Sequence, residues 1–389
     1  MRIAIFTESY EPIINGVSVS VSALREGLVA RGHEVFIFAP TYQGHIDDSD
    51  RVFRLPARHT FLMRDYPFPV PFAPEMRRQF AELKPDIVHT QTPFLLGVLG
   101  AKWARRYGIP FVSTNHTLYT EYAHYVPVRP KALTKWFLMR LMRWYYSGAD
   151  AVVVPSGPVE KILRSYGVKT PVEVIKTGID PIPASAPQSR EDVRQRCNVA
   201  QGGFLLLYVG RIAREKNLRM LLTAFESVAA THPNAKLLLV GGGPALAETQ
   251  AFAATLDLGD RIEFTGMLKR ADIDPIYGAA DAFAFPSTTE TQGIAICEAL
   301  SAGLPVVAVN AGGIPENLEH GCDGFLTNDD PAEFADRIAY LIDNPAERAA
   351  MSARARTNAC NFSIDAMVDR FERFYESVIA SGRQSAVTI

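Results

Sequence analysis

The sequence predicts an α/β protein with two Rossmann-like domains that face each other across a cleft. Its 389 residues are enough for two domains of roughly 100–200 residues each. Short apolar strands alternate with helical patterns in both halves, which is typical of parallel, doubly wound sheets. Residues 180–188, between the halves, contain three prolines and no apolar periodicity, so we expect a linker there.

The first half reads as strands that are followed by helices. Residues 3–6 form a short apolar run, and residues 16–30 have the periodicity of a helix. Later strands of this half are expected at 34–38, 86–89, 110–114 and 150–154. Further helices are expected at 94–107 and 156–166.

The second half repeats this pattern. Its strands are expected at 204–209, 236–240, 261–264, 282–285, 305–308 and 325–326. Its helices include 218–229 and 294–301, and the chain past residue 344 reads as helix to about 379. We therefore place a domain boundary at 180/181. In such sheets ligands bind at the carboxyl ends of the strands, so two facing edges suit a reaction between two substrates.

Composition and charge exclude several classes of protein. The chain is 48% hydrophobic and 21% charged with a net charge of −2, which argues against disorder and against nucleic-acid binding. The first 180 residues hold 22 Lys and Arg against 16 Asp and Glu, whereas the remainder holds 18 against 26. A basic first half suggests an anionic partner, although random surface variation is the alternative.

The cysteines and the apolar runs suggest a cytoplasmic protein. Four cysteines lie far apart without a C-x-x-C pair, which argues against a disulfide framework or a Cys-ligated zinc site. The first apolar run is too short for the core of a signal peptide, and no apolar run approaches 18 residues.

Two segments offer sites for phosphate. Asn15-Gly16 follows a strand and opens a helix, so it is either an anion site or simply a tight turn. Arg211 and Lys216 follow a strand end in VGRIAREKN, and together they suit a diphosphate. The alternative for this pair is ordinary surface charge, which is also the expectation for Arg214 and Glu215. No G-x-G-x-x-G is present, which argues against a dinucleotide-binding oxidoreductase.

Two carboxylates bracket the start of the helix expected at 294–301. Glu290 lies in the loop before it, and Glu298 lies within its first two turns. Thr291, Gln292 and Gly293 stand where the helix begins, which gives a second anion site. Because ionised carboxylates only accept hydrogen bonds, they suit the hydroxyls of a ligand. The pattern indicates a nucleotide-sugar site, with two solvated glutamates as the alternative.

These motifs resemble those of the retaining GT-B glycosyltransferases with a Glu–seven residues–Glu motif, of the family 4 type. The resemblance spans nearly the whole chain and rests on VGRIAREKN, FPSTTETQGIAICEALSAGLPVVA and GGIPE. FTESYEPIINGVSVSV, HTQTPFLLGVLG and TNHTLYTEYAHYV look most like the diacylglycerol glucosyltransferases and related glycolipid synthases. The resemblance implies an acceptor-binding domain at 1–180, to which a C-terminal helix at about 363–389 returns. The nucleotide-sugar domain would be 181–362.

The resemblance also implies roles for individual residues. Gly16 matches the glycine that approaches the donor diphosphate, and Arg211 and Lys216 match the pair that binds it. Glu290 matches the glutamate that contacts the donor sugar, and Glu298 the one that holds the ribose hydroxyls. Many relatives have two glycines where this chain has Asn15-Gly16.

A histidine and its neighbours suggest the acceptor side. His116 stands alone after the strand at 110–114 and matches an active-site histidine near the transferred sugar, although a structural histidine is the alternative. Tyr119, Tyr122 and His124 follow it and are candidates for lining an acceptor site, or for simple packing.

No metal or cofactor is expected. Asp48-Ser49-Asp50 resembles a metal-binding D-x-D but lies in a polar stretch, which favours a solvated loop. Arg211, Lys216 and a helix N-terminus are sufficient to neutralise a diphosphate leaving group. GT-B relatives are likewise metal-independent.

The segment 126–147 mixes basic and aromatic residues without any acid. This composition suits an anionic membrane interface, and a core-facing helix whose basic side chains extend to solvent is the alternative. Its candidate membrane or acceptor residues are Lys131, Lys135, Trp136, Arg140, Arg143 and Trp144.

The sequence thus predicts a peripheral enzyme at the inner face of the cell membrane. It would move a hexose, by resemblance glucose from UDP-glucose, to a lipid such as diacylglycerol with retention of configuration. Three alternatives remain: a glycosyltransferase with a soluble acceptor, a nucleotide-sugar epimerase of the same architecture, and a catalytically silent binding module.

Overall fold

The computed structural model describes residues 1–13, 15–47, 49–60, 63–70, 73–120, 131–183 and 187–387. The chain forms two compact units. Unit 1 comprises Met1–Gly178 and Ile364–Ile389, and unit 2 comprises Ile179–Ser363. The boundaries expected from sequence, after residues 180 and 362, lie within two residues of these. The expected α/β fold with two Rossmann-like units is confirmed.

Unit 1 is built on a seven-stranded parallel sheet with the order β3-β2-β1-β6-β7-β8-β9. Its strands are β1 (Arg2–Phe6), β2 (Glu34–Pro40), β3 (Val52–Leu55), β6 (Ile87–Thr90), β7 (Phe111–Thr114), β8 (Ala151–Val154) and β9 (Val172–Val174). A separate antiparallel pair consists of β4 (Ala57–Thr60) and β5 (Met63–Pro69). Since the seven strands are parallel, all their carboxyl ends lie along one edge.

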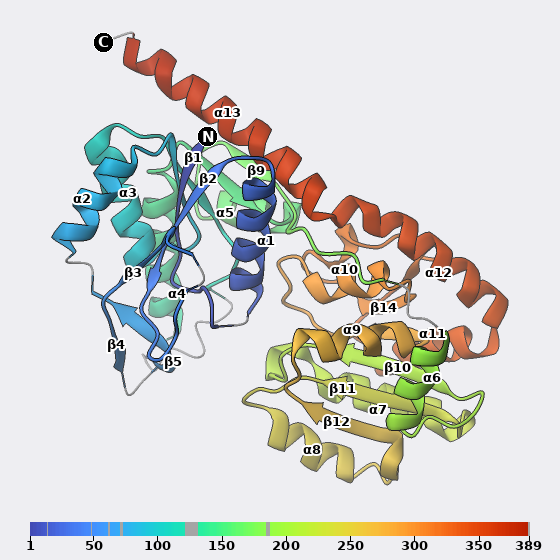
Figure 1. Ribbon diagram of the computed structural model, residues 1–389. Helices are drawn as coiled ribbons and strands as arrows, with labels where there is room; N and C mark the ends of the chain where they lie inside the picture. The colour runs from blue at the N-terminus through green and yellow to red at the C-terminus, as the bar shows by residue number, and fades with distance from the viewer. Residues whose placement is uncertain are drawn as a thin grey trace. The chain divides into compact units, whose positions relative to one another are not determined.

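Alternation along β1 explains how helices cover both faces of this sheet. Ile3 and Ile5 pack with the first and last helices of the chain, α1 (Gly16–Ala30) and α13 (Ile364–Val387). Ala4 and Phe6 face the opposite layer, which includes α3 (Leu95–Tyr107). The other helices of unit 1 are α2 (Pro74–Leu83), α4 (Lys131–Tyr146) and α5 (Gly157–Ser165). Figure 1 shows α13, the red C-terminal helix, running beside α1.

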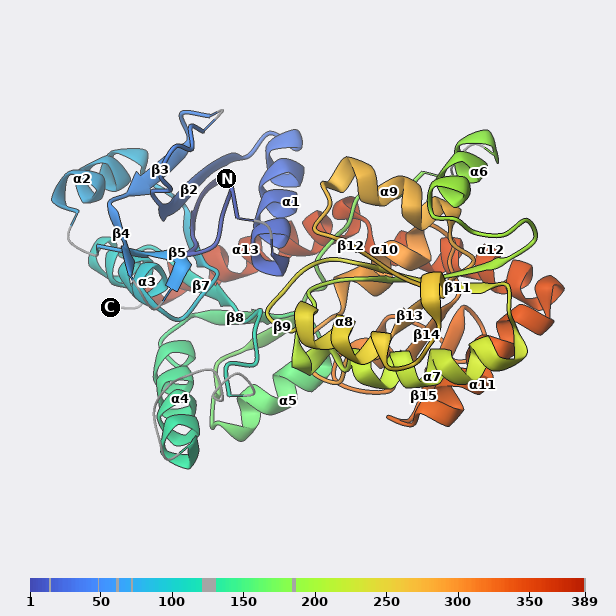
Figure 2. The same cartoon turned by 90° about the horizontal axis from the view of Figure 1, so that it is seen from below.

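Unit 2 has a six-stranded parallel sheet with the order β12-β11-β10-β13-β14-β15 and a single hydrophobic core. Its strands are β10 (Phe204–Val209), β11 (Ala235–Val240), β12 (Ile262–Gly266), β13 (Ala282–Phe285), β14 (Val306–Val309) and β15 (Gly324–Thr327). Its helices are α6 (Pro187–Arg196), α7 (Leu218–Thr231), α8 (Leu246–Ala254), α9 (Arg270–Ala279), α10 (Ile294–Ser301), α11 (Pro331–Asp343) and α12 (Pro345–Ala359). Helices α7 and α11 contact each other, as do α10 and α12 (Figure 2).

Three details differ from the sequence-based expectation. Strands β3, β4, β5 and β9 were not expected, and they lie at a sheet edge or in the separate hairpin. Helix α6 begins at Pro187, inside the expected linker, because proline is well suited to the first position of a helix. The helical run past residue 344 is broken, because Ser363 is extended, with φ −68° and ψ 152°.

Candidate functional site

The N-terminus of α1 is closed by its own cap. Asn15 Oδ1 accepts hydrogen bonds of 3.0 Å from the backbone N–H groups of Val17 and Ser18. In return, Ser18 Oγ accepts a 2.9 Å bond from the Asn15 N–H, which completes a capping box. Gly16 begins the helix and is exposed. The asparagine that replaces a glycine of many relatives therefore has a structural function of its own.

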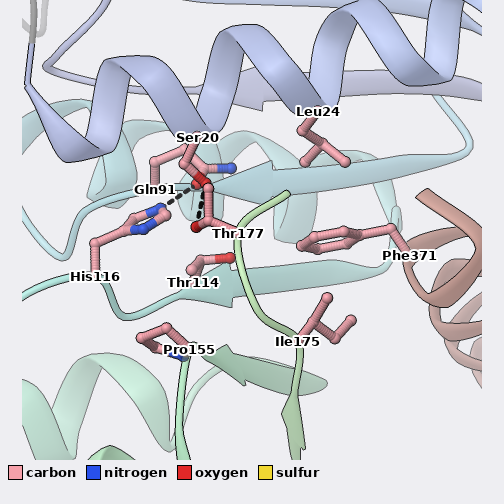
Figure 3. Close-up of a pocket in the computed structure, with 9 residues that line it drawn as sticks. All are labelled: Ser20, Leu24, Gln91, Thr114, His116, Pro155, Ile175, Thr177 and Phe371. Atoms are coloured by element: carbon pink, nitrogen blue, oxygen red, sulfur yellow. Dashed lines mark hydrogen bonds between the residues drawn. The ribbon is translucent and has the colours of Figure 1, made fainter. Parts of the chain in front are cut away.

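His116 lies directly after β7, at the carboxyl edge of the unit 1 sheet. Its Nε2 is 2.7 Å from Oε1 of Gln91, and because an amide oxygen only accepts, Nε2 carries the proton. Burial lowers the pKa of His116 to about 4, so the ring is neutral near pH 7. Both side chains line a small cavity beneath α1, together with Ser20, Thr114 and Thr177 (Figure 3). Gln91 Nε2 is buried without a hydrogen-bond partner, so the cavity offers a neutral imidazole and an amide donor.

A second histidine, His89, joins this cavity to the C-terminal helix. It is fully buried, with Nδ1 2.7 Å from the Tyr375 hydroxyl of α13 and Nε2 2.7 Å from Thr114 Oγ1. Burial lowers its pKa to about 3, so it too is neutral. His89 lies outside the residues that the sequence singles out. In the sequence, the only indication of its role is that a histidine stands inside a strand that is mostly apolar.

In unit 2 the structure gives the two expected cations different surroundings. Lys216 Nζ forms an ion pair with Glu290 Oε1, and both side chains are mostly buried. The Arg211 side chain is 56% exposed and lies 3.9 Å from Glu215 Oε1. The expectation that Glu215 is solvated was wrong, because its side chain is only 7% exposed. Arg214 is exposed and pairs with Glu248 at 3.0 Å.

Neighbouring glycines let the loop after β10 lie close to the loop after β11. A Cβ on Gly241 would stand 1.9 Å from the Gly210 carbonyl oxygen, and one on Gly243 would stand 2.3 Å from that of Ile212. Gly241 has a φ of 140°, which a larger residue rarely adopts. The VGGGP segment, not selected from sequence, thus positions the Arg211 loop.

Glu290 is held by the GGIPE segment. Its carbonyl oxygen accepts a 2.9 Å bond from the Gly313 N–H, and a Cβ on Gly312 would stand 2.3 Å from the same oxygen. The Asn317 side chain donates to the Gln292 carbonyl. Gly293 then caps α10 with a φ of 84°, a left-handed conformation that favours glycine. The 290–293 loop is therefore fixed at both ends, in front of a helix N-terminus.

Two hydroxyls in this loop were missed by the sequence reading. Ser287 Oγ and Thr289 Oγ1 follow the carboxyl end of β13, and both are buried without a hydrogen-bond partner. Buried polar atoms are normally hydrogen-bonded, so such atoms beside a candidate site suggest ligand contacts.

Glu298 lies in the second turn of α10 and is buried. Its Oε2 accepts a 2.9 Å bond from the Tyr277 hydroxyl, and its Oε1 forms an ion pair with Arg270 of α9. Burial, followed by the Glu298 charge, raises the pKa of Tyr277 well above its usual value. The Glu298 carboxylate is thus held in place by two residues that were not selected from sequence.

The structure describes only part of the expected acceptor side. Tyr119 packs edge-on against Phe94, with ring centroids 4.9 Å apart. Tyr122 and His124 lie outside the described residues, as does the side chain of Lys131.

Helix α4 has two distinct faces. Thr134, Met142, Tyr145 and Tyr146 are buried against unit 1. The outward face carries Leu133, Trp136, Phe137 and Trp144, all between 54% and 59% exposed. Lys135, Arg140 and Arg143 are exposed as well, and Arg140 lies 5.2 Å from the Trp136 ring centre. Among the described residues, no helix is long and apolar enough to cross a membrane.

Across the described ranges, no group of three or more His, Cys, Asp or Glu side chains is arranged to hold a metal ion. Asp48 of the D-x-D sequence falls outside those ranges, and Asp50 is exposed.

Comparison with known proteins decides the family. Residues 14–182 match the family model for Glycosyltransferase Family 4, and residues 189–358 match that for Glycosyl transferases group 1. An alpha-monoglucosyldiacylglycerol synthase of Streptococcus pneumoniae is 35% identical over 79% of this chain and 71% of that protein. The chain belongs to the family 4 glycosyltransferases.

Other relatives of this glycosyltransferase extend over nearly its whole length. An alpha-monoglucosyldiacylglycerol synthase of Acholeplasma laidlawii is 29% identical, covering 97% of this chain and 98% of its own. A GDP-mannose-dependent alpha-mannosyltransferase of Mycolicibacterium smegmatis is 31% identical over 99% of both chains.

Solved structures agree with the fold of this glycosyltransferase. Anabaena HepE in complex with UDP and glucose has a TM-score of 0.78 at 23% identity, covering 97% of this chain and all of that one. Sucrose-phosphate synthase from Thermosynechococcus elongatus has a TM-score of 0.81 at 22% identity, covering 98% of this chain and all of that one.

Proposed function

We propose that this glycosyltransferase transfers a hexose from a nucleotide sugar to a lipid alcohol at an anionic membrane surface. UDP-glucose is the proposed donor and diacylglycerol the proposed acceptor. The observation that carries the proposal is the constellation in unit 2, where Lys216, Glu290 and Glu298 stand around the loop at the N-terminus of α10. Two relatives at 35% and 29% identity are glucosyldiacylglycerol synthases by name, which favours this acceptor.

In the proposed mechanism, unit 2 binds the donor. Lys216 and Arg211 stabilise the negative charge that develops on the diphosphate as the glycosidic bond breaks. Backbone N–H groups of residues 291–293 support the same charge. Glu298 accepts hydrogen bonds from the ribose, and Glu290 contacts the sugar. From unit 1, Gly16 approaches the diphosphate and the neutral His116 contacts the transferred sugar.

We propose a front-face displacement that retains the anomeric configuration. The acceptor hydroxyl attacks from the face that the diphosphate leaves, through an oxocarbenium-like state, and its proton passes to the departing diphosphate oxygen. The carboxylate assigned to the sugar, Glu290, is paired with Lys216, which disfavours it as a covalent nucleophile. Isolation of a glycosyl adduct on Glu290 by mass spectrometry would overturn this mechanism, and NMR of the product gives the configuration.

The same proposal makes transfer independent of metal, because the cations of unit 2 are sufficient to neutralise the leaving group. Transfer is then expected to persist in EDTA once elemental analysis has excluded a tightly bound metal. Complete loss of transfer in EDTA, with rescue by Mg²⁺ or Mn²⁺, would indicate that Asp48 and Asp50 are metal ligands.

We propose that the outward face of α4 binds the membrane surface. Aromatic side chains next to Arg and Lys suit the interface of an anionic bilayer. This face would bring unit 1 to its lipid while the more acidic second half of the chain is repelled from the surface.

A donor screen is the deciding experiment. Thermal unfolding is measured with UDP, GDP and ADP, each alone and as a nucleotide sugar, because a ligand bound only by the native state raises the melting temperature. UDP and UDP-glucose are expected to give the largest shifts. A larger shift with GDP and GDP-mannose would replace the proposed donor, in keeping with the mannosyltransferase relative.

Product analysis then separates the remaining alternatives. Glycolipid from UDP-glucose and diacylglycerol supports the proposal, whereas transfer only to water-soluble alcohols supports a soluble acceptor. A new nucleotide sugar or free sugar made without any acceptor would indicate an epimerase.

A further inference from the structure

The Glu8 carboxyl stands between the end of β1 and the start of α3, and it has no role in the mechanism above. Its Oε1 accepts a 2.7 Å hydrogen bond from the N–H of Leu96, in the first turn of α3. Its Oε2 is buried and has no hydrogen-bond partner. One oxygen thus caps a helix, where a carboxylate is favourable, and the other lacks a donor.

Of the other buried atoms without partners at the same sheet edge, Gln91 Nε2 is a donor that belongs to the His116 cavity, and two can accept hydrogen bonds. They are Thr92 Oγ1 and Asn115 Oδ1, in residues that are 6% and 2% exposed. Thr92 follows β6 and Asn115 follows β7, and the strands β1, β6 and β7 are adjacent and parallel. Glu8, Thr92 and Asn115 are called the Glu8 cluster below.

The Glu8 cluster needs hydrogen-bond donors. An amide oxygen and an ionised carboxylate only accept, and a hydroxyl does both. Because buried polar atoms are rarely left unpaired, three such atoms at one sheet edge indicate contacts with a ligand that brings O–H groups.

The surroundings of the cluster contain no partner for an anion. Burial, and further the Glu8 charge, raises the pKa values of three nearby tyrosines: Tyr119 from the loop after β7, and Tyr145 and Tyr146 from the inner face of α4. Among the described residues, no Lys or Arg forms an ion pair with Glu8. Burial raises the pKa of Glu8 to about 7, against weaker lowering by the N–H groups of Leu96 and Gly97. A phosphate beside this carboxyl would add a second uncompensated negative charge.

The rim of α3 is apolar. Phe94 and Leu95 are each 37% exposed, and Phe94 stacks edge-on with Tyr119. An uncharged hydroxyl attached to apolar chains matches this combination of buried acceptors and exposed apolar surface.

We infer that the Glu8 cluster binds the head of an uncharged lipid alcohol, with Glu8 accepting the hydrogen bond of the hydroxyl that is glycosylated. The cluster disfavours acceptors that carry a phosphate beside this hydroxyl. The inference rests on the proposed lipid-glycosylating function and deepens it, because it selects neutral lipids over phospholipids as acceptors.

The first test is kinetic. Wild type, Glu8→Gln and the control Glu11→Gln are assayed on vesicles of phosphatidylcholine and phosphatidylglycerol that contain dioleoylglycerol, with the donor found in the nucleotide screen. Glu11 is exposed and lies three residues along the same loop, and glutamine at position 8 still accepts from the Leu96 N–H. The acceptor KM of Glu8→Gln is expected to rise at least tenfold, while the donor KM and the thermal shift with UDP stay unchanged. Glu11→Gln is expected to match wild type.

The second test uses pH and acceptor choice. The wild-type acceptor KM is expected to rise as pH falls from 8 to 6, because protonation of Glu8 removes the hydrogen-bond acceptor, and this dependence disappears in Glu8→Gln. Transfer to diacylglycerol is expected to exceed transfer to phosphatidylinositol at least tenfold. If Glu8→Gln does not fold, Thr92→Val is measured for the same rise in acceptor KM.

The possible outcomes distinguish failure of this inference from failure of the proposed function. Glycolipid synthesis with an unchanged acceptor KM in Glu8→Gln overturns the inference alone, as does a preference for phosphatidylinositol. No transfer to any lipid alcohol overturns the proposed function and the inference together.

Discussion

The burial and ion pairing of individual side chains in unit 2 indicate different roles for them. Lys216 is mostly buried and paired with Glu290, whereas Arg211 is exposed and only loosely associated with Glu215. Lys216 is thus already fixed beside Glu290, the carboxylate that we propose contacts the sugar. Arg211 retains the freedom to turn toward a diphosphate when one is bound.

Removing either cation is expected to slow transfer. Arg211→Ala or Lys216→Ala removes a charge-assisted contact to the leaving group and costs roughly 2–4 kcal/mol of transition-state stabilisation, a decrease of about 30-fold to 10³-fold in kcat. Arg214→Ala is the matched control, because Arg214 lies in the same loop but pairs with Glu248. Steady-state kinetics of the three variants test this. Near-normal turnover in both Arg211→Ala and Lys216→Ala would remove these residues from the mechanism.

The two carboxylates are expected to differ in what they bind. Glu298→Gln should weaken UDP and UDP-sugar by similar factors, because Glu298 is assigned to the ribose. Glu290→Gln should leave UDP binding nearly intact while it damages transfer. Titration calorimetry with UDP and UDP-glucose distinguishes the two, and the opposite pattern would mean that the roles are exchanged.

Glu8 also predicts a dependence of stability on pH. Its pKa is raised from 4.5 unfolded to about 7 folded, so between these values the folded state holds a proton that the unfolded state has lost. Its contribution to stability is therefore full below pH 4.5 and is lost as pH rises through 7. Glu8→Gln is expected to stabilise unit 1 at pH 8, by an amount on the order of 3 kcal/mol at most, and to have little effect at pH 4.

The measurement is the free energy of unfolding of both proteins at several pH values. The difference between variant and wild type is the readout, since the buried His89 and His116, whose pKa values are lowered, give the opposite slope in both proteins. A difference that does not change with pH would contradict the raised pKa.

At the scale of elements, α4 joins two environments. Its inner face supplies Tyr145 and Tyr146 to the surroundings of Glu8, and its outer face exposes Trp136, Phe137 and Trp144. In the proposed function, a helix with both properties would place the head of the neutral acceptor near the membrane surface that holds its acyl chains.

Binding to anionic vesicles, weakened by salt, is the expected behaviour of this helix. Each Lys or Arg near such a surface contributes about 1 kcal/mol within a Debye length. Lys135→Ser/Arg140→Ser should therefore reduce binding and glycolipid synthesis together. The control Arg77→Ser/Arg78→Ser removes the same charge from exposed positions of α2. Vesicle co-sedimentation measures both, and equal binding to neutral and anionic vesicles would contradict the electrostatic model.

At the scale of the whole molecule, the order of elements was predictable where periodicity is strong. Helix α1 has the bounds that its pattern gives, Gly16–Ala30, and the six strands of the unit 2 sheet lie within two residues of their expected places. Short edge strands such as Val172–Val174 were not predictable, because three residues carry no period and pair only through their neighbour β8.

The candidate site likewise has residues that the sequence predicts and residues that it does not. Lys216, Glu290 and Glu298 stand in recognisable motifs, and the sequence indicates them. Their partners Arg270 and Tyr277, and the His89–Tyr375 contact across 286 residues of chain, arise only from tertiary packing. A sequence pattern reports spacing along one element, whereas these contacts join elements that are distant in the chain.

The path of the chain makes unit 1 depend on its last helix. The chain leaves unit 1 at Gly178, builds unit 2, and returns with α13. Met367, Val368, Phe371 and Tyr375 are buried against α1 and the sheet. Arg31, at the end of α1, forms ion pairs with Asp365, Asp369 and Glu372 of α13.

Deletion of residues 364–389 is therefore expected to unfold unit 1 and spare unit 2. Loss of the buried side chains of α13, at roughly 2–5 kcal/mol each, exceeds the stability of an ordinary domain, whereas no residue of the unit 2 core is removed. Calorimetry should show one of two transitions lost, while UDP still raises the melting temperature of the remainder. A chain that ends at Gly382 is the control, since it keeps these buried residues and should behave as wild type. If the longer deletion retained both transitions, α13 would be an accessory to unit 1 and not part of its core.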